Sequence, residues 1–78
     1  MIDTRSEVGL RVTVRDDRII VALPGTWFTV VYRQLPGTFD LIATNVVDDM
    51  RFALKKADFL VRASRIANNK ARELGWIA

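Results

Sequence analysis

The chain has 78 residues, of which 50% are hydrophobic, a formal net charge of +3, and neither cysteine nor histidine. This length allows one domain with a single core, and the missing cysteine excludes disulfides and thiolate metal sites while fitting a reducing cytoplasm. The missing histidine removes the commonest general base and metal ligand. No apolar segment has signal-peptide or membrane-spanning length, so we expect a cytoplasmic protein that makes no membrane contact.

The first half of the chain predicts a hairpin followed by a turn. Residues 8–15 alternate apolar with polar side chains, which is typical of a half-buried strand. Asp16-Asp17 supplies turn-forming side chains. Residues 18–23 are apolar on both faces, which favours a central strand, and Pro24-Gly25 ends it.

A third strand is predicted over 26–33, where aromatic and β-branched residues are dense. Pro36-Gly37 predicts another turn. The alternation over 39–44 is compatible with a fourth strand, and the sequence leaves open whether the meander has three or four strands.

The longest helical pattern covers residues 58–74, with apolar side chains in one broad arc. Asp58 is the expected N-cap, because its carboxylate can accept hydrogen bonds from free amides. Gly75 is expected to end the helix in the left-handed conformation, with Trp76 folding back onto Ala71.

Residues 45–57 are ambiguous. Asp48 and Asp49 suit the first turn of a helix, where carboxylates meet the positive end of the dipole. The apolar stripe of this segment, however, points roughly 150° away from that of the main helix at about 100° per residue. We therefore expect a break over 55–58, and residues 48–55 form either a short helix or an irregular connection.

The fold class expected from these patterns is α+β, an antiparallel meander packed on a long C-terminal helix. One helix covers only one face of a sheet. The covered face should comprise the apolar positions of the strands: Leu10, Val12, Val14, Ile19, Val21, Phe28, Val30 and Tyr32. The other face should show an apolar patch centred on Trp27 with an arginine rim.

Two hypotheses for that open face place its function in binding. It is an interface with a second copy or another protein, since exposed apolar patches rich in tryptophan and arginine mark partners. The candidate interface residues are Trp27, Ile20, Val31, Arg11 and Arg33. Alternatively it binds nucleic acid, with arginines on phosphates and Trp27 stacking on a base. The candidate contacts are then Arg11, Arg15, Arg33, Arg62 and Arg65. Other ligands stay open, as does a third interpretation, in which residues 45–57 and 76–78 simply fold over this face.

No catalytic constellation is found, so we expect a binding domain without catalytic, metal or cofactor residues and without enzyme activity. Ser6 and Ser64 have no histidine to activate them. The pairs Asp16-Asp17 and Asp48-Asp49 are better explained by a turn and a helix start than by acid–base or metal chemistry. None of the glycines forms a phosphate-binding loop.

The segment WFTVVYR, the following turn, LIAT and the ending ANNKARELGW resemble short uncharacterised bacterial proteins. The resemblance covers about the last two thirds of the chain. It implies no activity, so no functional residue is carried over from it.

Overall fold

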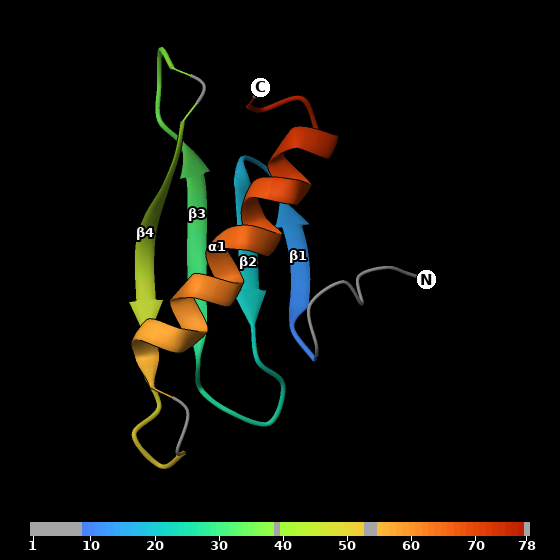
Figure 1. Cartoon of the computed structure of the whole chain (residues 1–78). Coiled ribbons are helices and arrows are strands. Elements are labelled where there is room, and N and C mark those ends of the chain that lie inside the picture. The colour runs from blue at the N-terminus through green and yellow to red at the C-terminus, as the bar shows by residue number, and fades with distance from the viewer. Residues whose placement is uncertain (1–8, 39, 53–54, 78) are drawn as a thin grey trace.

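The computed structural model describes residues 9–38, 40–52 and 55–77, and it shows one antiparallel sheet with a helix across one face (Figure 1). The strands are hydrogen-bonded in chain order, so the predicted α+β meander is confirmed and has four strands. The elements are β1 (Arg11–Arg15), β2 (Arg18–Ala22), β3 (Thr29–Gln34), β4 (Leu41–Val47) and α1 (Lys56–Glu73).

The β1–β2 hairpin turns at Asp16-Asp17, as predicted, and its last pair is Arg15 opposite Arg18. Asp16 has a φ of 56°, a left-handed conformation that aspartate tolerates better than most residues. The strand begins at Arg11 rather than at residue 8, which lies outside the described residues.

The β2–β3 connection is longer than predicted, because Thr26 belongs to the turn and not to β3. Its hydroxyl donates to the carbonyl of Leu23 at 2.8 Å and accepts from the amide of Phe28 at 3.1 Å. Side-chain bonds of this kind compete with a strand ladder, so β3 starts at Thr29. The strand β4 covers Leu41–Val47 rather than 39–44, and residue 39 lies outside the described part.

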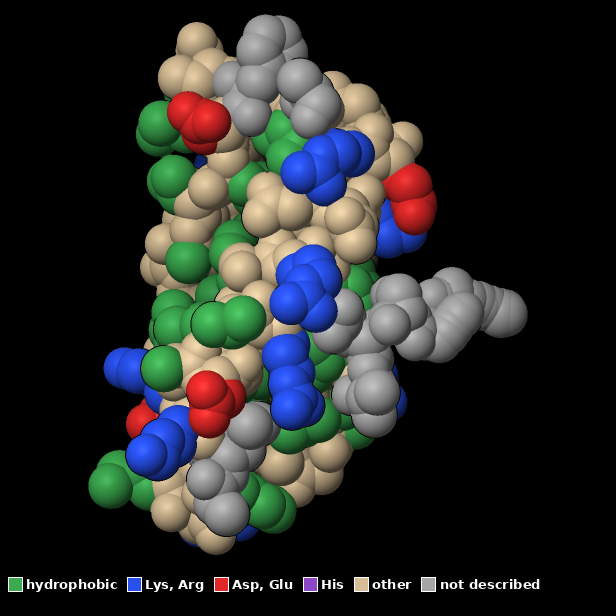
Figure 2. Space-filling view, in the orientation of Figure 1, with side chains coloured by type: hydrophobic (Ala, Val, Ile, Leu, Met, Phe, Trp, Pro, Cys, Tyr) green, Lys and Arg blue, Asp and Glu red, His purple; other side chains and the backbone are tan. Residues whose placement is uncertain are grey.

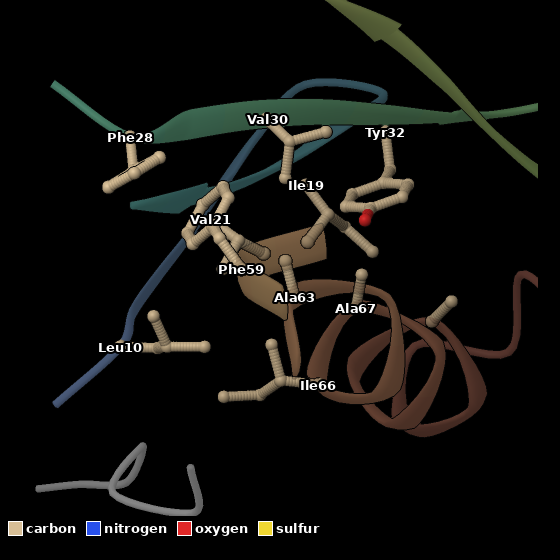
Figure 3. Packing of buried hydrophobic residues seen from close by; sticks show 11 residues of the cluster. Leu10, Ile19, Val21, Phe28, Val30, Tyr32, Phe59, Ala63, Ile66 and Ala67 are labelled. Carbon is tan, nitrogen blue, oxygen red and sulfur yellow. The ribbon is translucent and has the colours of Figure 1, made fainter. Parts of the chain in front are cut away.

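The core lies between α1 and the covered face of β2 and β3 (Figure 3). Phe28 and Phe59 stack at its centre, with ring centroids 5.2 Å apart. Each large apolar side chain buried here contributes about 1.5–3 kcal/mol. Most of the predicted core positions are buried, but Val12 is only half-buried and Val14 is exposed, since α1 packs over β2 and β3. The buried apolar residues are Leu10, Ile19, Val21, Phe28, Val30, Tyr32, Phe59, Ala63, Ile66, Ala67 and Ala71.

The two ends of α1 differ in how well the sequence predicted them. The helix begins at Lys56, with Lys55 in the N-cap position and no side-chain cap, so the assignment of Asp58 as the cap is wrong. Asp58 lies in the first turn, where its negative charge interacts favourably with the positive end of the helix dipole. At the other end, the amide of Trp76 donates to the carbonyl of Ala71 and Gly75 has a φ of 79°, which confirms the predicted glycine end.

The connection from β4 to α1 is a turn over its described residues 48–52. Residues 53–54 lie outside the described part. Asp48 and Asp49 therefore do not start a helix, so that interpretation is wrong, and over the described residues the alternative of an irregular connection holds. The start of α1 at Lys56 falls inside the predicted break over 55–58.

Candidate interaction surface

The sheet has one face without a covering element among the described residues, and we call it the open face. Helix α1 packs on the other face, over β2 and β3 (Figure 1). The described end of the chain also lies on the helix side, where Trp76 and Ile77 pack against the core and Gln34 Nε2 donates to the Trp76 carbonyl at 2.8 Å. The described part of the tail therefore does not fold over the open face.

The strand register sorts the open-face side chains into rows, because residues directly opposite in antiparallel strands point to the same side. One row runs Thr13, Ile20, Val31 and Asn45, and its neighbour runs Arg11, Ala22, Thr29 and Val47. The side chains on the two central strands of these rows are half-buried although no described helix or strand covers them. The middle of the open face is therefore apolar and partly accessible.

A third row places three arginines side by side at one end of the open face. Arg15 lies opposite Arg18, and Arg18 lies opposite Arg33. We call these three residues the arginine row. Like charges directly opposite each other are destabilising, so the arrangement needs compensation.

Asp17 supplies part of that compensation. Its carboxylate accepts a hydrogen bond of 2.8 Å from Arg33 Nη2 and lies 3.8 Å from Arg18 Nε. The hydrogen bond from Arg33 lowers the pKa of the Asp17 carboxyl. Within the described part of the chain Arg15 has no ion pair, so the row keeps a net positive charge.

Trp27 lies at the opposite end of the open face, and not at its centre as predicted. Its side chain is 62% exposed. The Arg51 guanidinium lies 3.9 Å from the centroid of the indole ring, within the range of a cation–π contact. This stack is positioned by a neighbouring carboxylate, Asp49.

Asp49 is 1% exposed and joins the two segments that meet here. Its carboxylate accepts from the Trp27 amide at 2.7 Å and from Arg51 Nε and Nη2 at 2.9 and 2.8 Å. The fork of the guanidinium matches the two carboxylate oxygens. These bonds, that from the Arg51 side chain first, outweigh burial and hold the pKa of the Asp49 carboxyl well below its usual value. Asp49 is therefore charged and fixes the turn beside Trp27.

Sequence reasoning missed this cluster. The Asp-x-Arg spacing of residues 49 and 51 is a weak local signal, and the third member, Trp27, lies 22 residues away in the chain. Neither periodicity nor turn chemistry connects such distant positions.

The predicted interface residues gather as expected with one exception. Ile20, Val31, Arg11 and Arg33 share the open face, while Trp27 stands at its end.

The predicted nucleic-acid contacts divide between two sides of the molecule. Arg62 and Arg65 are exposed on α1, which covers the other face, where Figure 2 shows basic side chains along the helix. They do not form one surface with Arg11, Arg15 and Arg33.

The described residues offer little to catalytic or metal chemistry. They include no group of three or more histidine, cysteine or acidic side chains arranged to hold a metal ion. The hydroxyl of Ser64 donates to the carbonyl of Val61 one turn earlier at 3.1 Å, an ordinary contact inside a helix.

No family model matches the chain, and neither the curated proteins nor the solved structures contain a match to it. The resemblance of the sequence to short bacterial proteins therefore stays a prediction. None of the helices in the described residues has the length and apolar character needed to cross a membrane.

Proposed function

We propose that this chain is a non-enzymatic binding domain that engages another protein through the open face of its sheet. The observation that carries the proposal is the group of apolar side chains in the middle of that face, Ile20, Ala22 and Val31, which are half-buried and bounded by charge. Contiguous apolar surface of this kind marks interaction sites. The boundary residues, the arginine row and the Trp27–Arg51 stack, are of the types enriched in interface hot spots.

The charge of the open face favours an acidic partner over a second copy of the chain. The face carries Arg11 and the arginine row, and the carboxylate that pairs with this row in the described part of the chain is Asp17. Stacking two copies by this face would bring many arginines together, and juxtaposed like charges oppose association. An acidic protein surface would pair with the arginines and cover Ile20 and Val31.

Nucleic acid is the second candidate, and the arginine row is the observation that favours it. Strands about 4.8 Å apart present the three guanidinium groups in a line that phosphates could follow. Two features favour a protein instead. Ile20 and Val31 are apolar and would make no polar contact with a phosphate backbone. One side of the Trp27 ring already contacts Arg51, so that side is not open to a stacking base.

Site-specific photo-crosslinking in cells tests the proposal. A photoreactive amino acid replaces Ile20 on the open face or, as a control, the exposed Asn69 on α1. We expect adducts at position 20 that protease removes and nuclease does not. The double change Arg15→Glu with Arg18→Glu should reduce them, because it reverses the charge of the row. Adducts equal to those at position 69 contradict the proposal.

The same experiment separates the second candidate. Adducts at position 20 that nuclease removes would favour nucleic acid. In that case, titration with short single-stranded and duplex oligonucleotides should show binding that falls steeply with salt. Oligonucleotide binding should also weaken in the Arg11→Ala and Arg15→Ala variants. It should not weaken in Arg62→Ala, because Arg62 lies on the other side of the molecule.

A further inference from the structure

The strand β4 is the least covered element of the sheet. All of its residues except Leu41 are exposed, and they include the large apolar side chains Ile42, Val46 and Val47. Helix α1 packs mainly over β2 and β3, and in Figure 1 only its first turn passes in front of the end of β4. Figure 2 shows hydrophobic side chains along the left edge of the molecule, where Figure 1 places β4. Apolar surface is therefore accessible on both faces of an edge strand.

The two edges of the sheet differ in chemistry. Arg11 and Arg15 stand on β1, whereas β4 has the sequence LIATNVV, without an ionisable residue or a proline. Natural sheets protect free edges with charges, prolines or bulges, because unpaired backbone groups recruit other strands. The protection found in β4 is a bulge, and the bulged residue Thr44 is tied back to β3 through a hydrogen bond of 3.3 Å to the Val31 carbonyl.

We propose that β4 pairs antiparallel with β4 of a second copy of this chain, joining two sheets of four strands into a continuous sheet of eight. Charge identifies the occupant as a second copy. The chain has a net charge of +3, and its described arginines stand on β1, on the open face, on α1 and, in Arg51, in the turn after β4. Two such copies can approach through β4, which has no ionisable residue, without bringing the arginines of β1 and of the open face together.

The alternation of faces allows a self-complementary register in which apolar residues meet on both sides of the sheet. Ala43 and Val46 point to the helix side, opposite Tyr32 and Val30, while Ile42 and Val47 point to the open face. Setting Ala43 opposite the Val46 of a second copy also sets Ile42 opposite the second copy's Val47. Apolar side chains then meet on both faces, and Thr44 with Asn45 lies at the twofold axis. A twofold axis perpendicular to the sheet repeats each contact, as an isologous dimer requires.

This inference does not rest on the proposed function, because it uses a different surface and a different partner. Pairing through β4 leaves the open face accessible and places two copies of it side by side. The binding of an acidic protein and the formation of the dimer can therefore fail independently.

Sedimentation of the full chain at high micromolar concentration gives the first test. We expect a dimer, and we expect Val46→Lys to weaken association at least about tenfold, since a lysine buried opposite Ala43 of the second copy, with no counter-ion, costs well over the ~1.4 kcal/mol of one decade. Val14→Lys is the matched control, because Val14 is 41% and Val46 39% exposed and Val14 lies on β1. Circular dichroism checks that each variant retains its helix.

Disulfide trapping tests the register without a destabilising charge, because the chain contains no cysteine. Oxidising a mixture of the single variants Ala43→Cys and Val46→Cys should give a crosslinked mixed dimer, and either variant alone should give far less. A Val14→Cys variant mixed with Val46→Cys should give none. A monomer in sedimentation, equal losses in Val14→Lys and Val46→Lys, or a dimer that Ile20→Lys abolishes and Val46→Lys spares would each overturn the proposal.

Discussion

At the scale of single residues, Asp49 shows how one carboxylate can organise a turn. It is buried, yet four hydrogen bonds from Trp27 and Arg51 satisfy its oxygens. Buried charges persist only when they are paired in this way. Because the pairing lowers the pKa of Asp49 in the folded chain below the ordinary value of 3.8, the charged form stabilises the fold above that pH.

Asp49→Asn should therefore destabilise the domain at neutral pH and lower its unfolding midpoint by several degrees. As pH falls below the ordinary value of 3.8 towards the lowered pKa, the wild-type carboxylate loses its advantage, and the gap between variant and wild type should narrow. Thermal unfolding at neutral and acidic pH measures this. The control is Asp40→Asn, at an exposed position, which should show no such gap. A gap that widens on acidification would refute the role given to Asp49.

At the scale of elements, local sequence patterns predicted the structural features that depend on neighbouring residues. The Asp16-Asp17 turn, the hairpin of β1 with β2, and the glycine end of α1 each depend on a few neighbouring residues, and each is confirmed. The start of β3 was not predicted, because the Thr26 side chain bonds two backbone groups in the turn. The Asp49 cluster was missed because it joins segments 22 residues apart.

The anchoring of α1 on the sheet depends on its buried face, and Phe59 is the largest side chain there. Phe59→Ala should cost about 3–5 kcal/mol, because it opens a cavity against Phe28. Two positions further on, Val61 is 59% exposed, so Val61→Ala should change stability by no more than about 0.5 kcal/mol. Urea unfolding followed by circular dichroism compares them. Similar losses in both variants would show that α1 does not pack as described.

At the scale of the whole molecule, we expect the arginine row to affect the stability of the fold and the binding of a partner in opposite directions. The arginine row should lower the stability of the fold, since like charges directly opposite each other in neighbouring strands are destabilising. Among the described residues, Asp17 pairs with Arg33 and Arg18, and Arg15 has no ion pair. Function and stability often conflict at binding sites. We therefore expect a binding surface to keep a row of charges that lowers stability when those charges face a partner.

Arg15→Gln tests that conflict, because Arg15 opposes Arg18 without an ion pair among the described residues. We expect a gain in stability on the order of a few tenths of a kcal/mol at low salt, which screening removes at high salt. Lys70→Gln changes the net charge equally but breaks the 2.9 Å pair with Glu73, so it should give no gain. The same Arg15 variant should bind an acidic partner more weakly. Thermal unfolding across a salt series decides the first part, and a loss of stability in Arg15→Gln at low salt would mean that the row supports the fold rather than a partner.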